Sequence, residues 1–263
     1  MLPITENTLQ VALFQMPLVW ENPKANREAI DQKIAQLPDT VALIVLPEMF
    51  TTGFTMNASK NAENIDGETT AWLQKKAQET QAALVGSIIV KEKNSYYNRL
   101  LFTYPSGEIM TYDKRHLFSY AGENNVYTAG NKKLIVTLNG WKICPLLCYD
   151  LRFPVWSRNT ENYDLLLYIA NWPKARINAW DTLLKARAIE NLSYCIGTNR
   201  VGIDSNSIEY PGHTAVYNAL GEIISGNTEN QEAVILATLA KNHLSETRER
   251  FQFLNDRDTF DLK

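Results

Sequence analysis

The chain has 263 residues, of which 45% are apolar and 21% charged, and its formal net charge is −3. These values are typical of a globular protein with a substantial core, in one large α/β domain or two small ones. The sequence has no basic patch that would indicate a nucleic-acid partner, and no stretch near the roughly 18 apolar residues that a membrane span needs.

The first half of the chain alternates strand and helix patterns. A helix is expected after Asn22, an N-cap followed by proline, because apolar residues then recur on one helix face. A second helix is expected to begin near Gly67. Continuous apolar runs, typical of strands covered on both faces, predict strands at residues 9–16, 41–46 and 83–90.

The second half mixes hairpins with further strands and one long helix. Turn signals at residues 105–107 and at Asn139-Gly140 predict two hairpins, 99–104 with 108–112 and 134–138 with 141–148. A helix is expected over 176–192, and the tail from Lys241 is highly charged. Further strands are predicted at 165–170, 193–198, 214–217, 222–225 and 233–238. This mixture favours mixed sheets covered by helices, a layered α/β sandwich.

Two features bear on the cellular environment and on metal binding. Residues Met1 to Asn7 show no basic region followed by an apolar run, so no secretory signal is predicted and a cytoplasmic location is expected. Three cysteines are too few for a disulfide framework, and they do not form a zinc-finger pattern with the three histidines. No metal site is expected.

Cys148 is the cysteine best placed for chemistry. An apolar strand ends there, and residues suited to starting a helix follow at once. A helix N-terminus favours negative charge, so we expect it to lower the pKa of this thiol, with the Tyr149 N–H facing a developing oxyanion. Asp150 and Arg152 are expected to fix the turn. The other two cysteines, inside apolar runs, are expected to be structural.

Two charged residues also follow predicted strands. Glu48 comes two residues after an apolar strand, at the carboxyl end where ligand sites of α/β sheets gather. There it could move protons. Lys114 follows another strand, and its ammonium could stabilise a developing negative charge. Taken singly, each would more readily be an exposed loop residue.

Together, these positions resemble the nitrilase superfamily of carbon–nitrogen hydrolases. The resemblance covers almost the whole chain and rests on the order Glu48, Lys114, Cys148 and on a series of motifs, which in chain order are L-P-E, Y-D-K-R-H-L-F, C-Y-D-L-R-F-P, I-A-N-W-P, K-A-R-A-I-E-N and G-H-T-A-V. It implies one domain over 1–263, a four-layer α–β–β–α sandwich and a homodimer. It also implies catalysis by Glu48, Lys114 and Cys148, with Glu123 as a second glutamate and no cofactor.

The motif wording is similar to that of the ω-amidase branch, which hydrolyses terminal amides of small 2-oxo acids such as 2-oxoglutaramate. The partner would then be a small amide substrate. Phe118 and Trp172 are expected to wall its pocket. Lys174 or Arg176 would bind its carboxylate, and the sequence does not decide between them.

Three alternatives stay open. A nitrilase or an N-carbamoyl hydrolase would use the same three residues. A Cys–His thiol enzyme would instead use His116 or His213, with Glu48 dispensable. A catalytically silent binding module is disfavoured, because a silent relative would be expected to lose at least one of the three positions.

Overall fold

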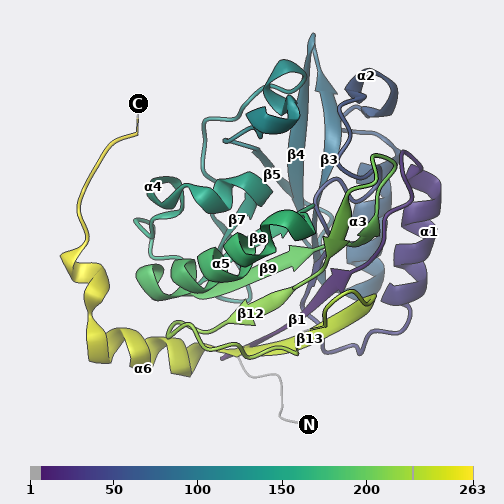
Figure 1. The fold of residues 1–263 in the computed structure, drawn as a ribbon. Coiled ribbons are helices and arrows are strands. Elements are labelled where there is room, and N and C mark those ends of the chain that lie inside the picture. The colour runs from purple at the N-terminus through teal and green to yellow at the C-terminus, as the bar shows by residue number, and fades with distance from the viewer. Residues whose placement is uncertain (1–6, 227, 263) are drawn as a thin grey trace.

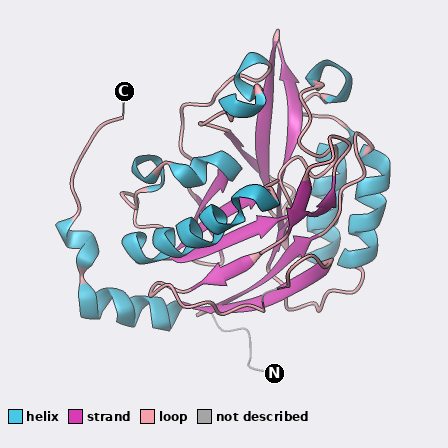
Figure 2. Ribbon diagram, in the orientation of Figure 1, coloured by secondary structure: helices cyan, strands magenta, loops and turns pink. Residues whose placement is uncertain are grey.

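The computed structural model describes residues 7–226 and 228–262, so most of the segment in which no secretory signal was found lies outside the described residues. Two large β-sheets pack face to face, and helices cover the outer face of each (Figures 1 and 2). This arrangement confirms the predicted four-layer α–β–β–α sandwich. No helix in the described ranges is long and apolar enough to cross a membrane.

The first sheet has six strands. Their bounds are β1 (Thr8–Gln15), β2 (Leu43–Val45), β3 (Ala83–Glu92), β4 (Ser95–Thr103), β5 (Ile109–Asp113) and β13 (Ala233–Ala240). They are ordered β13-β1-β2-β3-β4-β5, with β1, β2 and β3 parallel and the outer pairs antiparallel. Side chains alternate across β1 as a strand requires. Val11 and Leu13 face the second sheet, whereas Ala12 and Phe14 face the helices.

The second sheet has five strands. Their bounds are β6 (Val136–Leu138), β7 (Trp141–Leu147), β8 (Leu165–Ala170), β9 (Tyr194–Asn199) and β12 (Ala215–Tyr217). The order is β12-β9-β8-β7-β6, and β7, β8 and β9 run parallel. A separate two-stranded hairpin, β10 (Val201–Ile203) with β11 (Glu209–Pro211), stands outside both sheets.

The helices are α1 (Pro23–Ile34), α2 (Ala58–Asn61), α3 (Glu68–Thr80), α4 (Pro154–Ser157), α5 (Ile177–Asn191) and α6 (Lys241–Phe251). α1 and α3 pack Ile30 and Leu73 on the outer face of the first sheet. α5 packs Trp180 and Leu184 on β9. It approaches so closely that a Cβ at Gly197 would lie 2.3 Å from a Leu184 methyl carbon, so glycine is needed there.

Several elements differ from the sequence-based prediction, which did not include α2, α4 or the β10–β11 hairpin. The strand predicted at 222–225 is wrong: an isolated bridge pairs Ile223 with Tyr217, and the ladder does not continue because the Val216 N–H donates to the Ser225 hydroxyl at 2.9 Å. Strand 41–46 is reduced to β2. The charged tail contains α6, which was not predicted because few of its residues are apolar; Leu244 and Thr247 are the buried ones.

Candidate active site

Cys148 lies on the sharp turn at the carboxyl end of β7. It begins a 3₁₀ turn, η3 (Cys148–Arg152), and its φ is +39°. This left-handed conformation is uncommon for a residue with a Cβ and often marks a functional turn. The residue is half-buried and lines a cavity, so a small molecule can reach it.

Three buried charged side chains gather beside Cys148. Glu48 follows β2, Lys114 follows β5, and Glu123 begins a short 3₁₀ turn, η2 (Glu123–Asn125). The Lys114 Nζ lies 2.9 Å from Oε1 of Glu48 and 2.9 Å from Oε2 of Glu123. Each buried charge is therefore paired, as such charges must be. The structure thus brings together all four residues that the resemblance assigned to catalysis.

Two asparagines complete this cluster. The Asn98 Nδ2 donates to Oε1 of Glu48 at 2.8 Å, and the backbone N–H of Asn171 donates to Oε2 at 3.0 Å. The Asn171 side chain also donates to the Glu48 carbonyl oxygen at 2.6 Å. Sequence reasoning noted Asn171 only as part of a motif. It missed Asn98, which lies in β4 just before the point where that strand was predicted to begin.

Burial raises the pKa of the Cys148 thiol well above its ordinary value, and the Glu48 carboxylate, which also hydrogen-bonds the thiol, raises it further. The opposing effect of Lys114 is smaller. The expectation that the turn lowers this pKa is therefore wrong, because burial and the nearby carboxylates outweigh any favourable backbone dipole. The resting thiol is neutral and needs a base to become a nucleophile.

The pKa values of Lys114 and Glu123 also reflect burial and the charges that surround them. Burial alone would lower the pKa of the Lys114 ammonium, but Glu123 and Glu48 outweigh it and raise this pKa well above the usual range. Lys114 is therefore a fixed positive charge. Burial raises the pKa of Glu123, with Lys114 opposing this shift and Glu48 adding to it.

Asp150 ties the Cys148 turn to the segment that carries Lys114. Its carboxylate accepts from the Leu147 N–H at 3.0 Å and from the Tyr112 hydroxyl at 2.7 Å. It also accepts from the His116 N–H at 3.0 Å and lies 2.7 Å from the His116 Nδ1. These contacts agree with the expected role of Asp150 in fixing the turn. They fix the position of the Cys148 turn relative to the segment that carries Lys114.

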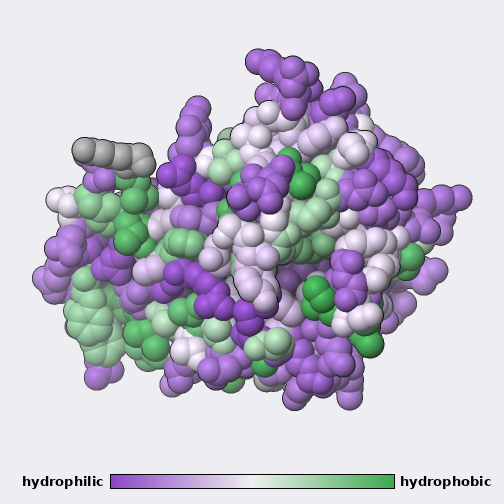
Figure 3. All heavy atoms as spheres, turned by 45° about the horizontal axis from the view of Figure 1, so that its top comes forward, coloured by the Kyte–Doolittle hydropathy of each residue, from purple (hydrophilic) through white to green (hydrophobic). Residues whose placement is uncertain are grey.

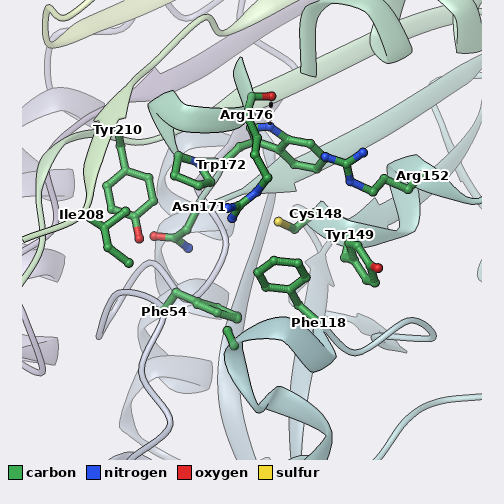
Figure 4. A pocket seen from close by; sticks show the side chains of 12 residues that line it. Phe54, Phe118, Cys148, Tyr149, Arg152, Asn171, Trp172, Arg176, Ile208 and Tyr210 are labelled. Carbon is green, nitrogen blue, oxygen red and sulfur yellow. Dashed lines mark hydrogen bonds between the residues drawn. The ribbon is translucent and has the colours of Figure 1, made fainter. Parts of the chain in front are cut away.

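The cavity above Cys148 is small, about 70 Å³ in volume. Figure 4 shows Cys148 between Tyr149 on one side and Ile208 and Tyr210 on the other. The lining is largely apolar and aromatic, as in most small-molecule sites. It consists of Phe54, Phe118, Ala121, Cys148, Tyr149, Arg152, Asn171, Trp172, Pro173, Arg176, Ile208 and Tyr210. The expected wall residues Phe118 and Trp172 are among them.

Two arginines carry the positive charge of this lining. The Arg176 guanidinium lies over the Phe118 ring, 5.0 Å from its centroid, and that of Arg152 lies over Trp172 at the same distance. Within residues 7–226 and 228–262, neither forms an ion pair with a carboxylate, and no acidic residue lines the cavity. Arg152 was expected to fix the turn, and its place in the lining was not foreseen.

Lys174, the other candidate for a substrate carboxylate, does not line the cavity. Its ammonium lies 2.7 Å from Oε2 of Glu209, and both side chains are more than half exposed. Lys174 and Arg176 belong to one 3₁₀ turn, η4 (Lys174–Arg176). Residues two apart on such a turn point to different sides, so the turn that directs Arg176 inward directs Lys174 outward.

Neither histidine of the Cys–His alternative lines the cavity. His116 pairs with Asp150 and stacks on Phe153, with ring centroids 3.7 Å apart. His213 pairs with Asp181 at 2.9 Å. The groups that act on the Cys148 thiol are instead Glu48, Lys114 and Glu123. The geometry therefore favours a carboxylate base over an imidazole.

Comparison with known proteins gives the family of this chain. Residues 10–249 match the family model of carbon–nitrogen hydrolases, so the chain belongs to that family. It is 46% identical to the ω-amidase YafV of Yersinia enterocolitica, over 97% of this chain and 98% of the relative. It is also 29% identical to the 2-oxoglutaramate amidase of Bacillus subtilis strain 168, over 94% and 96% of the two chains.

Solved structures show the same fold. A protein of this superfamily from Xanthomonas campestris, XC1258, carries an arsenic adduct in its active site. It is 41% identical and superposes with a TM-score of 0.95 over 97% of this chain and 99% of that one. Nit3 of Saccharomyces cerevisiae shares the fold at 22% identity, with a TM-score of 0.85 over 93% and 94% of the two chains.

Proposed function

We propose that this carbon–nitrogen hydrolase is an ω-amidase that converts small 2-oxo dicarboxylic acid monoamides to the acid and ammonia. The observation that carries the proposal is the buried Glu48–Lys114 pair beside Cys148, beneath a small cavity. The lining of this cavity, as far as the structure describes it, contains two arginines and no acidic residue. The similarity to ω-amidases over nearly the full length supports the same substrate class.

In the first half-reaction, the Cys148 sulfur attacks the amide carbonyl carbon while Glu48 accepts the thiol proton. The resulting oxyanion is stabilised by the Lys114 ammonium and the Tyr149 N–H, each worth roughly 3 kcal/mol, or about a hundredfold in rate. Glu48 then protonates the amide nitrogen, the carbon–nitrogen bond breaks, and ammonia leaves a thioester on Cys148.

The second half-reaction hydrolyses the thioester. Glu48 removes a proton from water, the resulting hydroxide attacks the thioester carbonyl carbon, and the carbon–sulfur bond breaks. The proton returns from Glu48 to the Cys148 sulfur. Glu123 acts through Lys114, whose ammonium it holds at 2.9 Å. The chain's own residues supply every proton transfer in this scheme.

The two arginines give the cavity its preference for an anionic substrate. A carboxylate buried among aromatic walls costs several kcal/mol unless a donor pairs with it. Guanidinium groups bind carboxylates through two parallel hydrogen bonds. Figure 4 shows the Arg176 guanidinium directed into the cavity toward Cys148, whereas Arg152 lies across Trp172. Arg176 therefore serves as the main carboxylate partner, with Arg152 supporting it.

The test is ammonia release from 2-oxoglutaramate, compared with hydrolysis of an aliphatic nitrile and an N-carbamoyl amino acid of similar length. We expect kcat/KM to favour the ω-amide by at least about a hundredfold, the discrimination expected when polar groups of a site would otherwise go unpaired. A nitrile or carbamoyl substrate that equals it would move the protein to another branch of the family and leave the Glu48–Lys114–Cys148 roles intact.

We also propose that the protein is a single domain and works in the cytoplasm.

We propose further that it forms a homodimer. Exposed apolar side chains lie on α4, on α5 and on the C-terminal arm, which comprises α6 and the residues that follow it; they are Val155, Ile189, Phe253 and Leu262. Figure 3 shows hydrophobic surface at the side of this arm, and Figure 1 shows the arm leaving the body of the protein. Sedimentation equilibrium should give twice the 29.9 kDa chain mass.

A further inference from the structure

The β10–β11 hairpin forms one wall of the cavity without belonging to either large sheet. As a ladder its strands pair only with each other among the described residues, Val201 with Pro211 and Ile203 with Glu209. Single backbone hydrogen bonds connect it to the rest of the protein: the Val201 N–H donates to the Met16 carbonyl at 3.2 Å, and the Asn230 N–H donates to the Pro211 carbonyl at 2.8 Å. A two-stranded ribbon alone is marginally stable in water, so its position depends on contacts with the rest of the protein. Ile208 and Tyr210 are the residues that it contributes to the lining.

Tyr210 is held firmly in this wall. Its side chain is buried, and its hydroxyl donates to Oδ2 of Asp204 at 2.9 Å. The guanidinium of the buried Arg200 lies over its ring, 4.5 Å from the centroid. A ring with contacts of this kind on its edge and its face has little freedom to move. Tyr210 therefore closes this side of the cavity with a fixed surface.

Ile208 is held less firmly at the outer edge of the same wall. Its backbone N–H donates to Oδ1 of Asp204 at 3.0 Å, but its side chain is 41% exposed. It thus lines the cavity with one side and meets solvent with the other. Its size therefore affects how far the cavity extends on this side.

An exposed ion pair fastens the hairpin to the turn that carries Arg176. Glu209 follows Ile208 directly, and its partner Lys174 begins η4, at a distance of 2.7 Å. Exposed pairs of this kind add little to stability and are screened by salt. The contact therefore positions the Ile208 edge of the hairpin beside η4 without adding much to stability.

We propose that the β10–β11 hairpin sets the size of acyl group that the site accepts, with Ile208 as the specificity-determining residue and the Lys174–Glu209 pair as its fastener. The inference rests on the proposed function, since it concerns the acyl group of the amide substrate. It gives Lys174 a role in access in place of the carboxylate binding considered from the sequence.

Two ratios test the inference. The first is kcat/KM for a 2-oxo acid ω-amide with two extra methylene groups, relative to 2-oxoglutaramate. The second is the rate at which N-benzyl iodoacetamide alkylates Cys148, relative to iodoacetamide, with Cys148→Ala as the control for labelling elsewhere. Ile208→Ala should raise both ratios at least tenfold. Removing three carbon atoms from an apolar wall should weaken the exclusion of larger acyl groups by at least about that factor.

Ile203→Ala is the matched control. Ile203 lies on the same hairpin, is 64% exposed and does not line the cavity, so its replacement should leave both ratios within twofold of wild type. Lys174→Glu and Glu209→Lys should each raise the ratios, and the double exchange should return them toward wild type. Ile208→Val provides a milder change if Ile208→Ala fails to fold.

The two proposals can fail separately. Ratios unchanged in folded Ile208→Ala or Ile208→Val would overturn the role of the hairpin, whatever the substrate. Absence of ammonia release from every ω-amide by the wild-type protein would overturn the proposed function. In that case the alkylation ratio still decides about the hairpin, because it needs no turnover. Single charge reversals without effect would remove the fastener from the proposal.

Discussion

The backbone N–H of Asn171 donates a hydrogen bond of 3.0 Å to Oε2 of Glu48. Lys114 and Asn98 donate to the other oxygen, Oε1, at 2.9 and 2.8 Å. The two carboxylate oxygens therefore have different partners, and the group cannot rotate without losing them. The orientation of the base is set before substrate binds, which lowers the reorganisation needed during reaction.

Replacing Glu48 with glutamine should lower both activity and stability. We expect kcat to fall by about 10²–10⁴-fold, the usual contribution of a general base. The free energy of unfolding should fall by about 1–3 kcal/mol, because the new NH₂ group would face a donor in either orientation. Ammonia release and urea unfolding measure the two effects. Glu28→Gln, at an exposed helix position, should change neither.

Lys114→Met should destabilise the protein by about 3–5 kcal/mol, because two buried carboxylates would lose their common counter-ion. Adding Glu48→Gln and Glu123→Gln to this variant should restore much of the loss, since the uncompensated charges are then gone. Lys24→Met, which breaks the exposed pair with Glu28, should cost less than about 1 kcal/mol. An equal loss in both single lysine variants would contradict the inferred buried cluster.

The raised pKa of Cys148 predicts how its alkylation depends on pH. Below its pKa the thiol is protonated and unreactive, so a raised pKa leaves little thiolate near neutrality. The rate of labelling by iodoacetamide should therefore keep rising beyond pH 9.0, the ordinary value for a thiol. A plateau near pH 6 or 7 would instead indicate a thiolate–imidazolium pair of the Cys–His kind.

Cys148 should also be the cysteine that reacts. Cys144 and Cys195 lie inside β7 and β9, where burial raises the pKa of each thiol and blocks access. Cys148→Ala should abolish turnover in a folded protein, whereas Cys144→Ala should keep it. Peptide mapping after brief alkylation will locate the label. Loss of activity in a well-folded Cys144→Ala variant, with Cys148→Ala still active, would reverse the assignment.

Arg176→Gln should act on binding of the substrate carboxylate. We expect KM for 2-oxoglutaramate to rise at least tenfold, because a buried carboxylate would lose a charged donor. KM for a neutral amide of similar size should change little. Lys75→Gln, at an exposed position of α3 outside the cavity, is the control for loss of a positive charge elsewhere on the protein. A similar rise for both amides would show that Arg176 shapes the cavity without recognising charge.

The charged residues around the thiol could be predicted from the sequence because they follow strands in the order and motifs of the nitrilase superfamily; singly, Glu48 and Lys114 would have been assigned to exposed loops. Glu48, Lys114 and Cys148 follow strands at their ends, where side chains from different segments meet. Asn98 has no such position. It lies within β4, where buried residues are expected to be apolar, and its role became visible only when its amide was seen beside two carboxylates.

The residues that line the cavity were less predictable than the charged residues beside Cys148. Arg152 and Arg176 both lie on short 3₁₀ turns, whose few residues give no periodic pattern in the sequence. Ile208 and Tyr210 come from a hairpin that the sequence-based strands did not include. Their contribution depends on how distant segments pack, which local patterns do not record.

Glu48 follows a strand of the first sheet, while Cys148 and Asn171 follow strands of the second. The base and the nucleophile are therefore assembled by the docking of two separate layers. During refolding, activity should return only after the layers have met, even if each sheet forms earlier. Enzyme activity thus serves as a reporter of long-range assembly, and core variants that loosen the contact between the layers should inactivate the enzyme before they unfold it.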